Sequence, residues 1–207
     1  PLDDRSAVEQ AGIERPTEES AKDSYTYYPH TSAVPEAVAV NIRGKSFKIV
    51  SNVEITDANA SGVIFAHGSR FGGHSLFIKD HKLYYVYNFL GISEQQLVSG
   101  VLKPGKYTVG MEFNKEKAGD HGESIGSAKL YVNEKEVATG SMRAQVGKFT
   151  LVGDGLCVGY DSGDNVSKLY KSPGEFKGGQ ISFVKVSTGK EQYSDLEKDA
   201  QRMFSTE

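Results

Sequence analysis

Residues 62–91 contain the pattern that most constrains the fold of this chain. Apolar side chains alternate with other residues at Leu76, Ile78, Leu83, Tyr85 and Tyr87, around a polar stretch at 79–82. A period of two sends one set of side chains toward a core and the other toward solvent or a second layer. The preceding residues, 67–74, include three glycines, which favour a turn or a close backbone approach. We therefore predict a strand, a glycine-rich loop and a hairpin.

Similar strand signals occur along most of the sequence, separated by turn residues. We expect strands at 25–29, 38–42, 46–55, 94–100, 106–113, 127–133, 135–140, 149–152, 155–159 and 179–187. The first should be an edge strand, because Pro29 has no N–H for a central ladder. Many short strands without alternating helices indicate an all-β fold, and the 23 glycines and 11 tyrosines agree with it. We predict an antiparallel two-sheet jelly-roll β-sandwich.

Both ends of the chain are expected to be helical, which gives three regions. Residues 1–24 should form a helical arm or linker, 25–190 the sandwich, and 191–207 a C-terminal helix. The residues expected on the buried face of that second helix are Leu196, Ala200, Met203 and Phe204. Ser194 and Glu197 have the spacing of a capping box.

Charge and hydropathy exclude two classes of partner. The net charge of −3 offers no basic face for nucleic acid, and no apolar run approaches the ~18 residues of a membrane span. The polar start is unlike a signal peptide, and an initial Pro1 suggests a processed chain or an excised fragment. Cys157 is the single cysteine, so no internal disulfide is expected.

The order of several motifs resembles a known superfamily. The segments 76–88, 104–113, 128–138 and 176–186 together resemble the laminin-G and concanavalin-A-like jelly rolls. A narrower resemblance, carried by 1–5, 28–29, 34–43, 67–74, 87–91 and 155–163, is to the C-terminal region of large bacterial arylsulfatases. It covers nearly the whole chain and includes irregular loops as well as strands.

The arylsulfatase resemblance implies a parent with a separate catalytic domain that uses a formylglycine and a divalent metal. Cys157 is followed by Val158 and Gly159, which departs from the formylglycine motif. The implied role of this chain is a non-catalytic accessory domain whose partner is the sulfatase domain, and which shapes its cleft or an oligomer. The expected setting is soluble, in a bacterial cytoplasm or periplasm.

A ligand site is predicted around the glycine-rich stretch. His67, Arg70 and His74 could hold an anion or a sugar, since arginine makes bidentate contacts with oxyanions. The site residues expected beside them are Tyr85, Tyr87 and Asn88. The alternatives are a structural corner and an aromatic row buried in the core. This site gives the second interpretation of the chain, a carbohydrate- or sulfated-ligand-binding module.

Two further possibilities follow from the acidic residues. Asp161, Asp164 and Asn165, with Asp154 nearby, supply hard oxygens of the kind that Ca²⁺ prefers, although without EF-hand spacing. No other cofactor is expected. A glycoside hydrolase on the same fold would need two facing carboxylates, and the strands show no such inward set, so this hypothesis ranks last.

Overall fold

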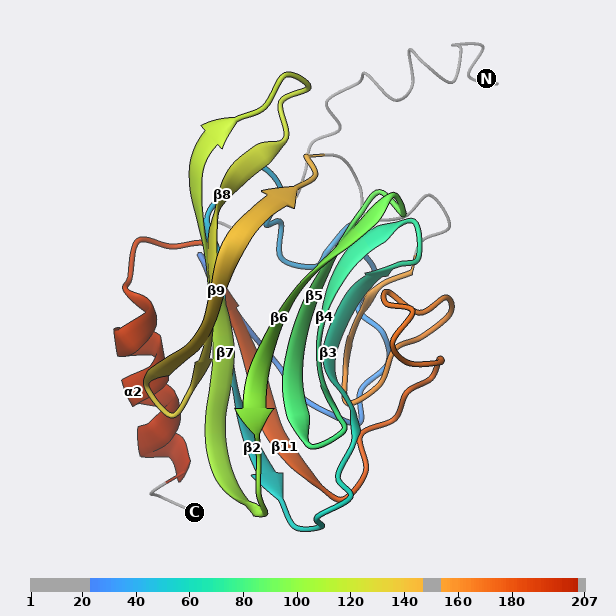
Figure 1. Ribbon diagram of the computed structural model, residues 1–207, viewed down its shortest axis with the longest axis vertical. Coiled ribbons are helices and arrows are strands. Elements are labelled where there is room, and N and C mark those ends of the chain that lie inside the picture. The colour runs from blue at the N-terminus through green and yellow to red at the C-terminus, as the bar shows by residue number, and fades with distance from the viewer. Residues whose placement is uncertain (1–22, 147–153, 205–207) are drawn as a thin grey trace, which may run out of the picture.

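The computed structural model describes residues 23–146 and 154–204, which form two antiparallel sheets packed face to face (Figure 1). The six-stranded sheet has the order β1 (Ser24–Tyr27), β11 (Gly179–Ser187), β2 (Phe47–Ile55), β7 (Gly105–Ala118), β8 (Ser124–Val132) and β9 (Lys135–Ala144). The five-stranded sheet has the order β10 (Leu156–Val158), β3 (Gly62–Ser69), β4 (Gly72–Lys79), β5 (Lys82–Phe89) and β6 (Ser93–Val101). The predicted fold class, an all-β jelly-roll sandwich, is confirmed.

Alternate residues of both sheets fill the space between them. Phe47 and Ile49 of β2 meet Phe65, Leu76 and Leu83 of the five-stranded sheet, and all five are fully buried. Successive strand residues point to opposite faces, so this alternation fixes which side of each sheet is the core. The alternating pattern in the sequence therefore identified the interior correctly.

Four expectations about local structure need correction or fall outside the described residues. The stretch 67–74 is not a loop, because it continues β3 and β4 up to a turn at Arg70 and Phe71. Residues 38–42 form no strand; Val38 is exposed, and Val40 and Ile42 enter the core from a connecting segment. The predicted arm at 1–24 lies outside the described residues as far as residue 22, and Ser24 belongs to β1 instead of the arm. The predicted strand at 149–152 also lies outside the described residues.

The C-terminal helix α2 (Tyr193–Phe204) covers the outer face of the six-stranded sheet (Figure 1). Its buried side chains are Tyr193, Leu196, Glu197 and Ala200. Met203 is 53% exposed, so its predicted place on the buried face is wrong. The predicted capping box is also absent, because the helix begins at Tyr193 and Ser194 already lies inside its first turn. The Glu197 carboxylate instead accepts a hydrogen bond from the Glu134 N–H at 2.6 Å. In the described residues no helix has the length and apolar character needed to cross a membrane.

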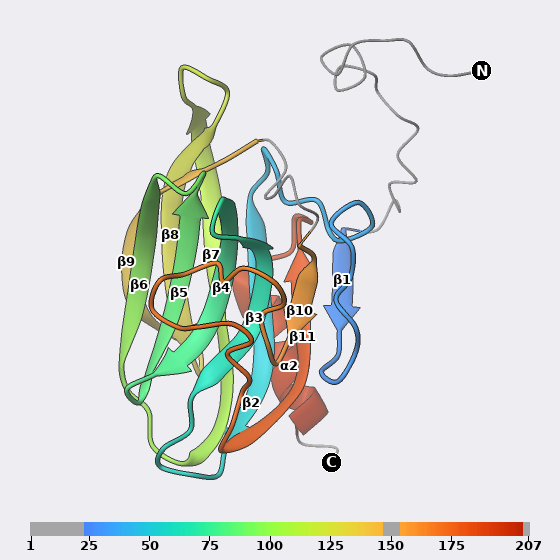
Figure 2. The same ribbon diagram turned by 90° about the vertical axis from the view of Figure 1, so that its right-hand side faces the viewer.

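A long connection, residues 159–177, lies over the outer face of the five-stranded sheet and is called the cover segment here (Figure 2). Its backbone carbonyls accept hydrogen bonds from the sheet, Val166 from Asn88 Nδ2 at 2.8 Å and Leu169 from Lys79 Nζ at 2.8 Å. The Tyr170 hydroxyl lies 3.0 Å from Ser75 Oγ. These contacts make a small buried layer on the second face of the sheet.

Candidate ligand-binding site

Four of the predicted ligand residues lie in the core and do not reach solvent. His67 and His74 are cross-strand partners on β3 and β4, and they and the rings of Tyr85 and Tyr87 are at most 1% exposed. The Tyr85 hydroxyl lies 3.1 Å from His74 Nδ1, and the Tyr87 hydroxyl accepts a hydrogen bond from the Gln145 N–H at 2.9 Å. The prediction that these side chains face a ligand is therefore wrong, and the alternative of an aromatic row in the core is correct.

Burial sets the charge state of this internal group. Desolvation lowers the pKa of His67 to about 3, with a further contribution from the Arg43 charge. The pKa of His74 is lowered well below its usual value, again by burial first and then by His67. An imidazolium loses more hydration than a neutral ring on transfer to an apolar interior. Both histidines are thus neutral at physiological pH and act as polar packing groups.

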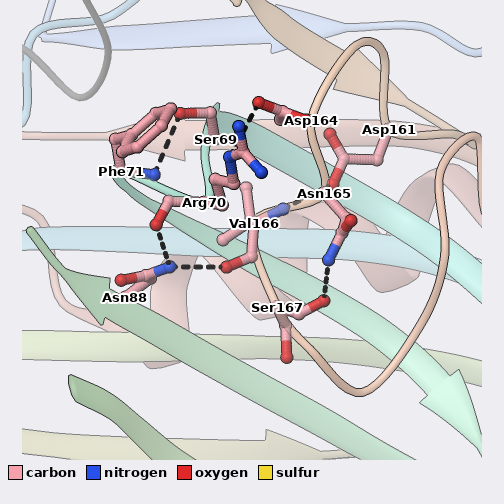
Figure 3. Close-up of polar contacts among 9 residues, drawn as sticks. All are labelled: Ser69, Arg70, Phe71, Asn88, Asp161, Asp164, Asn165, Val166 and Ser167. Atoms are coloured by element: carbon pink, nitrogen blue, oxygen red, sulfur yellow. Dashed lines mark hydrogen bonds and ion pairs between the residues drawn. The ribbon is translucent and has the colours of Figure 1, made fainter. Parts of the chain in front are cut away.

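Arg70 is the predicted ligand residue that remains at the surface. It is the first residue of the β3–β4 turn, and its side chain is 64% exposed. The guanidinium Nε lies 3.0 Å from the Asp164 carboxylate, and the guanidinium carbon stands 4.8 Å from the centre of the Phe71 ring (Figure 3). The Phe71 side chain is itself half exposed. An aromatic ring and an oriented ion pair therefore lie side by side at this corner.

Asn88 holds this corner in place and does not face solvent. Its Nδ2 donates to the carbonyls of Arg70 at 3.1 Å and Val166 at 2.8 Å (Figure 3). Its Oδ1 accepts from the Gly91 N–H at 2.9 Å. One buried amide therefore ties the β3–β4 turn, the cover segment and the β5–β6 turn together. Asn88 is a positioning residue, not the ligand residue that was predicted.

The β5–β6 turn extends the same exposed area with apolar side chains. Gly91 has a φ of +72°, and a Cβ there would lie 2.9 Å from the Arg70 carbonyl oxygen, so the two turns approach closely. The Leu90 N–H donates to Gln145 Oε1 at 3.3 Å, which brings the end of β9 alongside. We define the tip surface as Arg70, Phe71, Leu90, Ile92, Val146 and Asp164. The sequence analysis did not select the apolar residues of this surface. The occurrence of large apolar side chains in turns could have indicated them.

The three predicted calcium ligands are each engaged by a different partner. The Asp161 carboxylate accepts from the Val166 N–H at 2.9 Å and the Tyr170 hydroxyl at 2.5 Å, and burial raises its pKa to about 6. Asp164 pairs with Arg70, and Asn165 Nδ2 donates to the Ser167 carbonyl. Within 23–146 and 154–204, no three His, Cys, Asp or Glu side chains are placed to hold a metal ion. These residues do not fit a calcium site as arranged, and we derive no chemistry from it.

A second opening lies at the other end of β3 and β4. It is a cleft of about 400 Å³ between these strands and residues 169–177. Its walls include the rings of Phe77 and Tyr170, whose centres are 5.0 Å apart in an edge-to-face arrangement. Its charged groups are Lys79, Glu175 and Lys177. The seven residue-to-residue steps of β3, from Gly62 to Ser69, separate this cleft from the tip surface by roughly 23 Å, at about 3.3 Å per step.

Comparison with known proteins places the fold but does not assign a family. No family model matches the chain, and no curated protein sequence matches it significantly. Solved structures do match. The CBM40 module of the Ruminococcus gnavus IT-sialidase aligns with a TM-score of 0.59 at 15% identity, over 86% of this chain and 97% of that module. The chain is a jelly-roll β-sandwich. The same module bound to α2,3-sialyllactose gives a TM-score of 0.55 at 16% identity, over 86% of this chain and 97% of that module.

A toxin domain provides a more distant likeness. The binding domain of botulinum neurotoxin serotype D aligns with a TM-score of 0.54 at 7% identity, over 87% of this chain and 42% of that chain. The jelly roll thus spans less than half of the toxin structure. At these identities the likeness concerns the fold, and it agrees with the concanavalin-A-like architecture expected from the motif order.

Proposed function

We propose that this chain is a carbohydrate-binding module that uses the tip surface. The observation that carries the proposal is the half-exposed Phe71 ring beside the Arg70–Asp164 pair, on turns fixed by the buried Asn88 amide. A sugar ring has an apolar C–H face that packs on an aromatic ring, and hydroxyl groups that both donate and accept hydrogen bonds. Arg70, whose guanidinium carbon lies 4.8 Å from the centre of the Phe71 ring, offers donors, and its partner Asp164 offers acceptors.

The similar solved structures support the same class of function. One is a carbohydrate-binding module of a sialidase, another is that module with sialyllactose bound, and a third is a toxin binding domain. A fold hosts many functions, so this support is by analogy, and the tip surface supplies the chemical argument. We propose accordingly that the chain acts by binding and not by catalysis.

Hydrolysis is the less favoured alternative on this fold. Glycoside hydrolysis needs two carboxylates flanking the scissile bond. At the tip surface the described acid, Asp164, is paired with Arg70, and the described lining of the cleft has one carboxylate, Glu175. Neither arrangement supplies an acid and a base or nucleophile facing each other.

The role as an arylsulfatase accessory domain is supported only by the sequence resemblance. The solved structures named above are a sialidase module and a toxin domain, and they add no support for it. One structural observation favours it as a second candidate. Phe71, Leu90, Ile92 and Val146 are 44–78% exposed on one end of the sandwich. Neighbouring exposed apolar side chains of this kind mark contact surfaces. The same surface would then pack on a catalytic domain.

Calorimetric titration of a glycan panel tests the binding proposal. The panel contains neutral, sialylated and sulfated oligosaccharides, and the variants are Phe71→Ala and Arg70→Ala. We expect saturable binding that falls at least about tenfold in each variant, since hot-spot side chains contribute about 2 kcal/mol or more.

Matched variants control for general effects. Tyr28→Ala removes a 58% exposed aromatic ring from another edge, and Arg202→Ala removes an arginine paired with Asp199 at 3.3 Å. Both should bind as the parent does. Absence of binding across the panel would reject the module and favour the accessory-domain candidate.

A further inference from the structure

The cleft between β3, β4 and the cover segment contains a fixed positive charge. Lys79 Nζ donates to the Leu169 carbonyl at 2.8 Å, which holds the ammonium at the cleft wall. An ammonium has three N–H donors and no acceptor. Within the described residues, Lys79 has no carboxylate in ion-pair contact and no second hydrogen-bond acceptor. Two of its donors are therefore available to a ligand.

The other charged groups of the cleft leave a positive balance. Glu175 and Lys177 lie 3.8 Å apart at the rim, with side chains 61% and 76% exposed, so they largely neutralise each other. Asp161 does not line the cleft, and its carboxylate accepts hydrogen bonds from the Tyr170 hydroxyl and the Val166 N–H instead of contacting Lys79. The whole protein carries a net charge of −3, so this local positive charge is not a reflection of overall composition.

Apolar and aromatic groups form the rest of the cleft. Phe77, Ile78, Leu169 and Tyr170 line it, and Phe77 stacks on Tyr84 with ring centres 5.2 Å apart. A rigid apolar wall with one oriented charge is typical of small-ligand pockets. It suits a ligand with a compact apolar face and a single acidic group.

We propose that this cleft is a second binding site, which takes an acidic sugar residue and holds its carboxylate or sulfate on Lys79. The anion part of the proposal rests on the cleft itself, and the saccharide part rests on the proposed function. The two sites lie at opposite ends of the same two strands, so an extended acidic glycan or two separate chains could occupy them independently.

The test uses a tip-deficient double variant, Arg70→Ala with Phe71→Ala, so that binding at the cleft is measured alone. Glucuronate is titrated against glucose, which differs in having a hydroxymethyl group in place of the carboxylate. We expect glucuronate to bind at least about tenfold more tightly, as a charge-assisted hydrogen bond provides. Amide NMR shifts should concentrate at Gly62, Gly174 and Lys177.

Substitutions then separate a specific site from general attraction. In the same background, Lys79→Met should abolish the preference for glucuronate, and Lys79→Arg should keep it. Lys82 pairs in register with Lys79 across the β4–β5 hairpin but does not line the cleft, so Lys82→Met is the matched control. Glu175→Gln should raise the affinity about two- to fivefold by removing a like charge.

Several outcomes would overturn the proposal. Equal affinity for glucose and glucuronate would show that the carboxylate is not recognised. Equal losses of affinity in the Lys79 and Lys82 variants would show that the anion is attracted by general positive charge and not held by Lys79. Inorganic sulfate binding as tightly as glucuronate or glucose 6-sulfate would reject the saccharide class. Because the tip is disabled, failure here leaves the proposed function of the tip surface standing, and failure at the tip leaves the cleft standing.

Discussion

The interior and the tip of the β3–β4 hairpin use similar residues in opposite ways. His67 and His74 are directly paired across the hairpin and lie in the core, whereas Arg70, three residues beyond His67, is 64% exposed. The difference comes from position along the strands. Paired strand residues must point to one face or the other, but turn residues extend past the end of the sheet. Polar side chains at paired positions therefore become packing groups, and those in the turn become available to a ligand.

The largest expected difference is in stability. Replacing the core residue Tyr85 by alanine should lower the free energy of unfolding by about 3–5 kcal/mol, because it leaves a cavity and removes the hydroxyl that contacts His74 Nδ1. Replacing Phe71 by alanine should cost less than about 1 kcal/mol, since its ring is half exposed. Urea unfolding of the two variants measures the contrast. Similar losses would mean that the tip is as much a part of the core as the interior is.

The second difference is in pH dependence, and its sign follows from the buried histidines. The pKa values of both histidines are lowered in the folded state. Below the unfolded pKa of about 6.5 the unfolded chain therefore binds more protons than the folded chain, and the free energy of unfolding decreases as the pH is lowered. Asp161 acts oppositely, because its raised pKa of about 6 makes the folded state take up a proton as the pH falls. Each group contributes at most about 1.4 kcal/mol per pH unit.

Variants separate these opposing contributions between pH 6.5 and 5. His67→Gln should reduce the loss of stability on acidification by up to about 1.4 kcal/mol per pH unit, which is the contribution of one proton. Asp161→Asn should make the same loss steeper below pH 6. Chemical unfolding at four pH values provides the measurement. An unaltered slope in His67→Gln would contradict the burial of a neutral imidazole.

Asn88 connects the buried interior and the tip of the hairpin, and its replacement should have an effect on stability between those of Tyr85→Ala and Phe71→Ala. Asn88→Ala should lower stability by about 1–3 kcal/mol, because buried carbonyls of Arg70 and Val166 lose their donor. It should also weaken glycan binding at the tip, although Asn88 itself is 3% exposed. Thermal unfolding with glycan titration tests both. Lost stability with unchanged binding would show that the turn geometry does not matter to the ligand.

The smallest expected effect concerns calcium. Chelation with EDTA should leave the unfolding temperature unchanged within about 1 °C, because Asp161, Asp164 and Asn165 already have protein partners and no binding energy is lost. Differential scanning calorimetry with and without millimolar Ca²⁺ is the measurement. A clear rise with Ca²⁺ would restore the calcium site predicted from the sequence.

The candidate site shows where sequence analysis succeeded and where it could not. It selected Arg70 and Asp164, but for separate purposes, as an anion ligand and a calcium ligand, and the structure pairs them at 3.0 Å. They are 94 positions apart, and no local pattern indicates that the cover segment returns to the β3–β4 turn. Lys79 received no role from the sequence, because its neighbours Leu169 and Tyr170 come from that same distant segment.

The sequence by itself determined the fold class, the strand alternation and most of the turns. These depend on residues within a few positions of one another, through the two-residue period of a strand and the backbone preferences of turn residues. The tertiary structure alone decided which polar side chains are buried and which form a surface. His67 and Arg70 lie three positions apart in one glycine-rich stretch, yet His67 is buried in the core and the Arg70 side chain is exposed at the turn. Burial is a property of distant contacts, and burial fixes the charge state and the accessibility of these side chains.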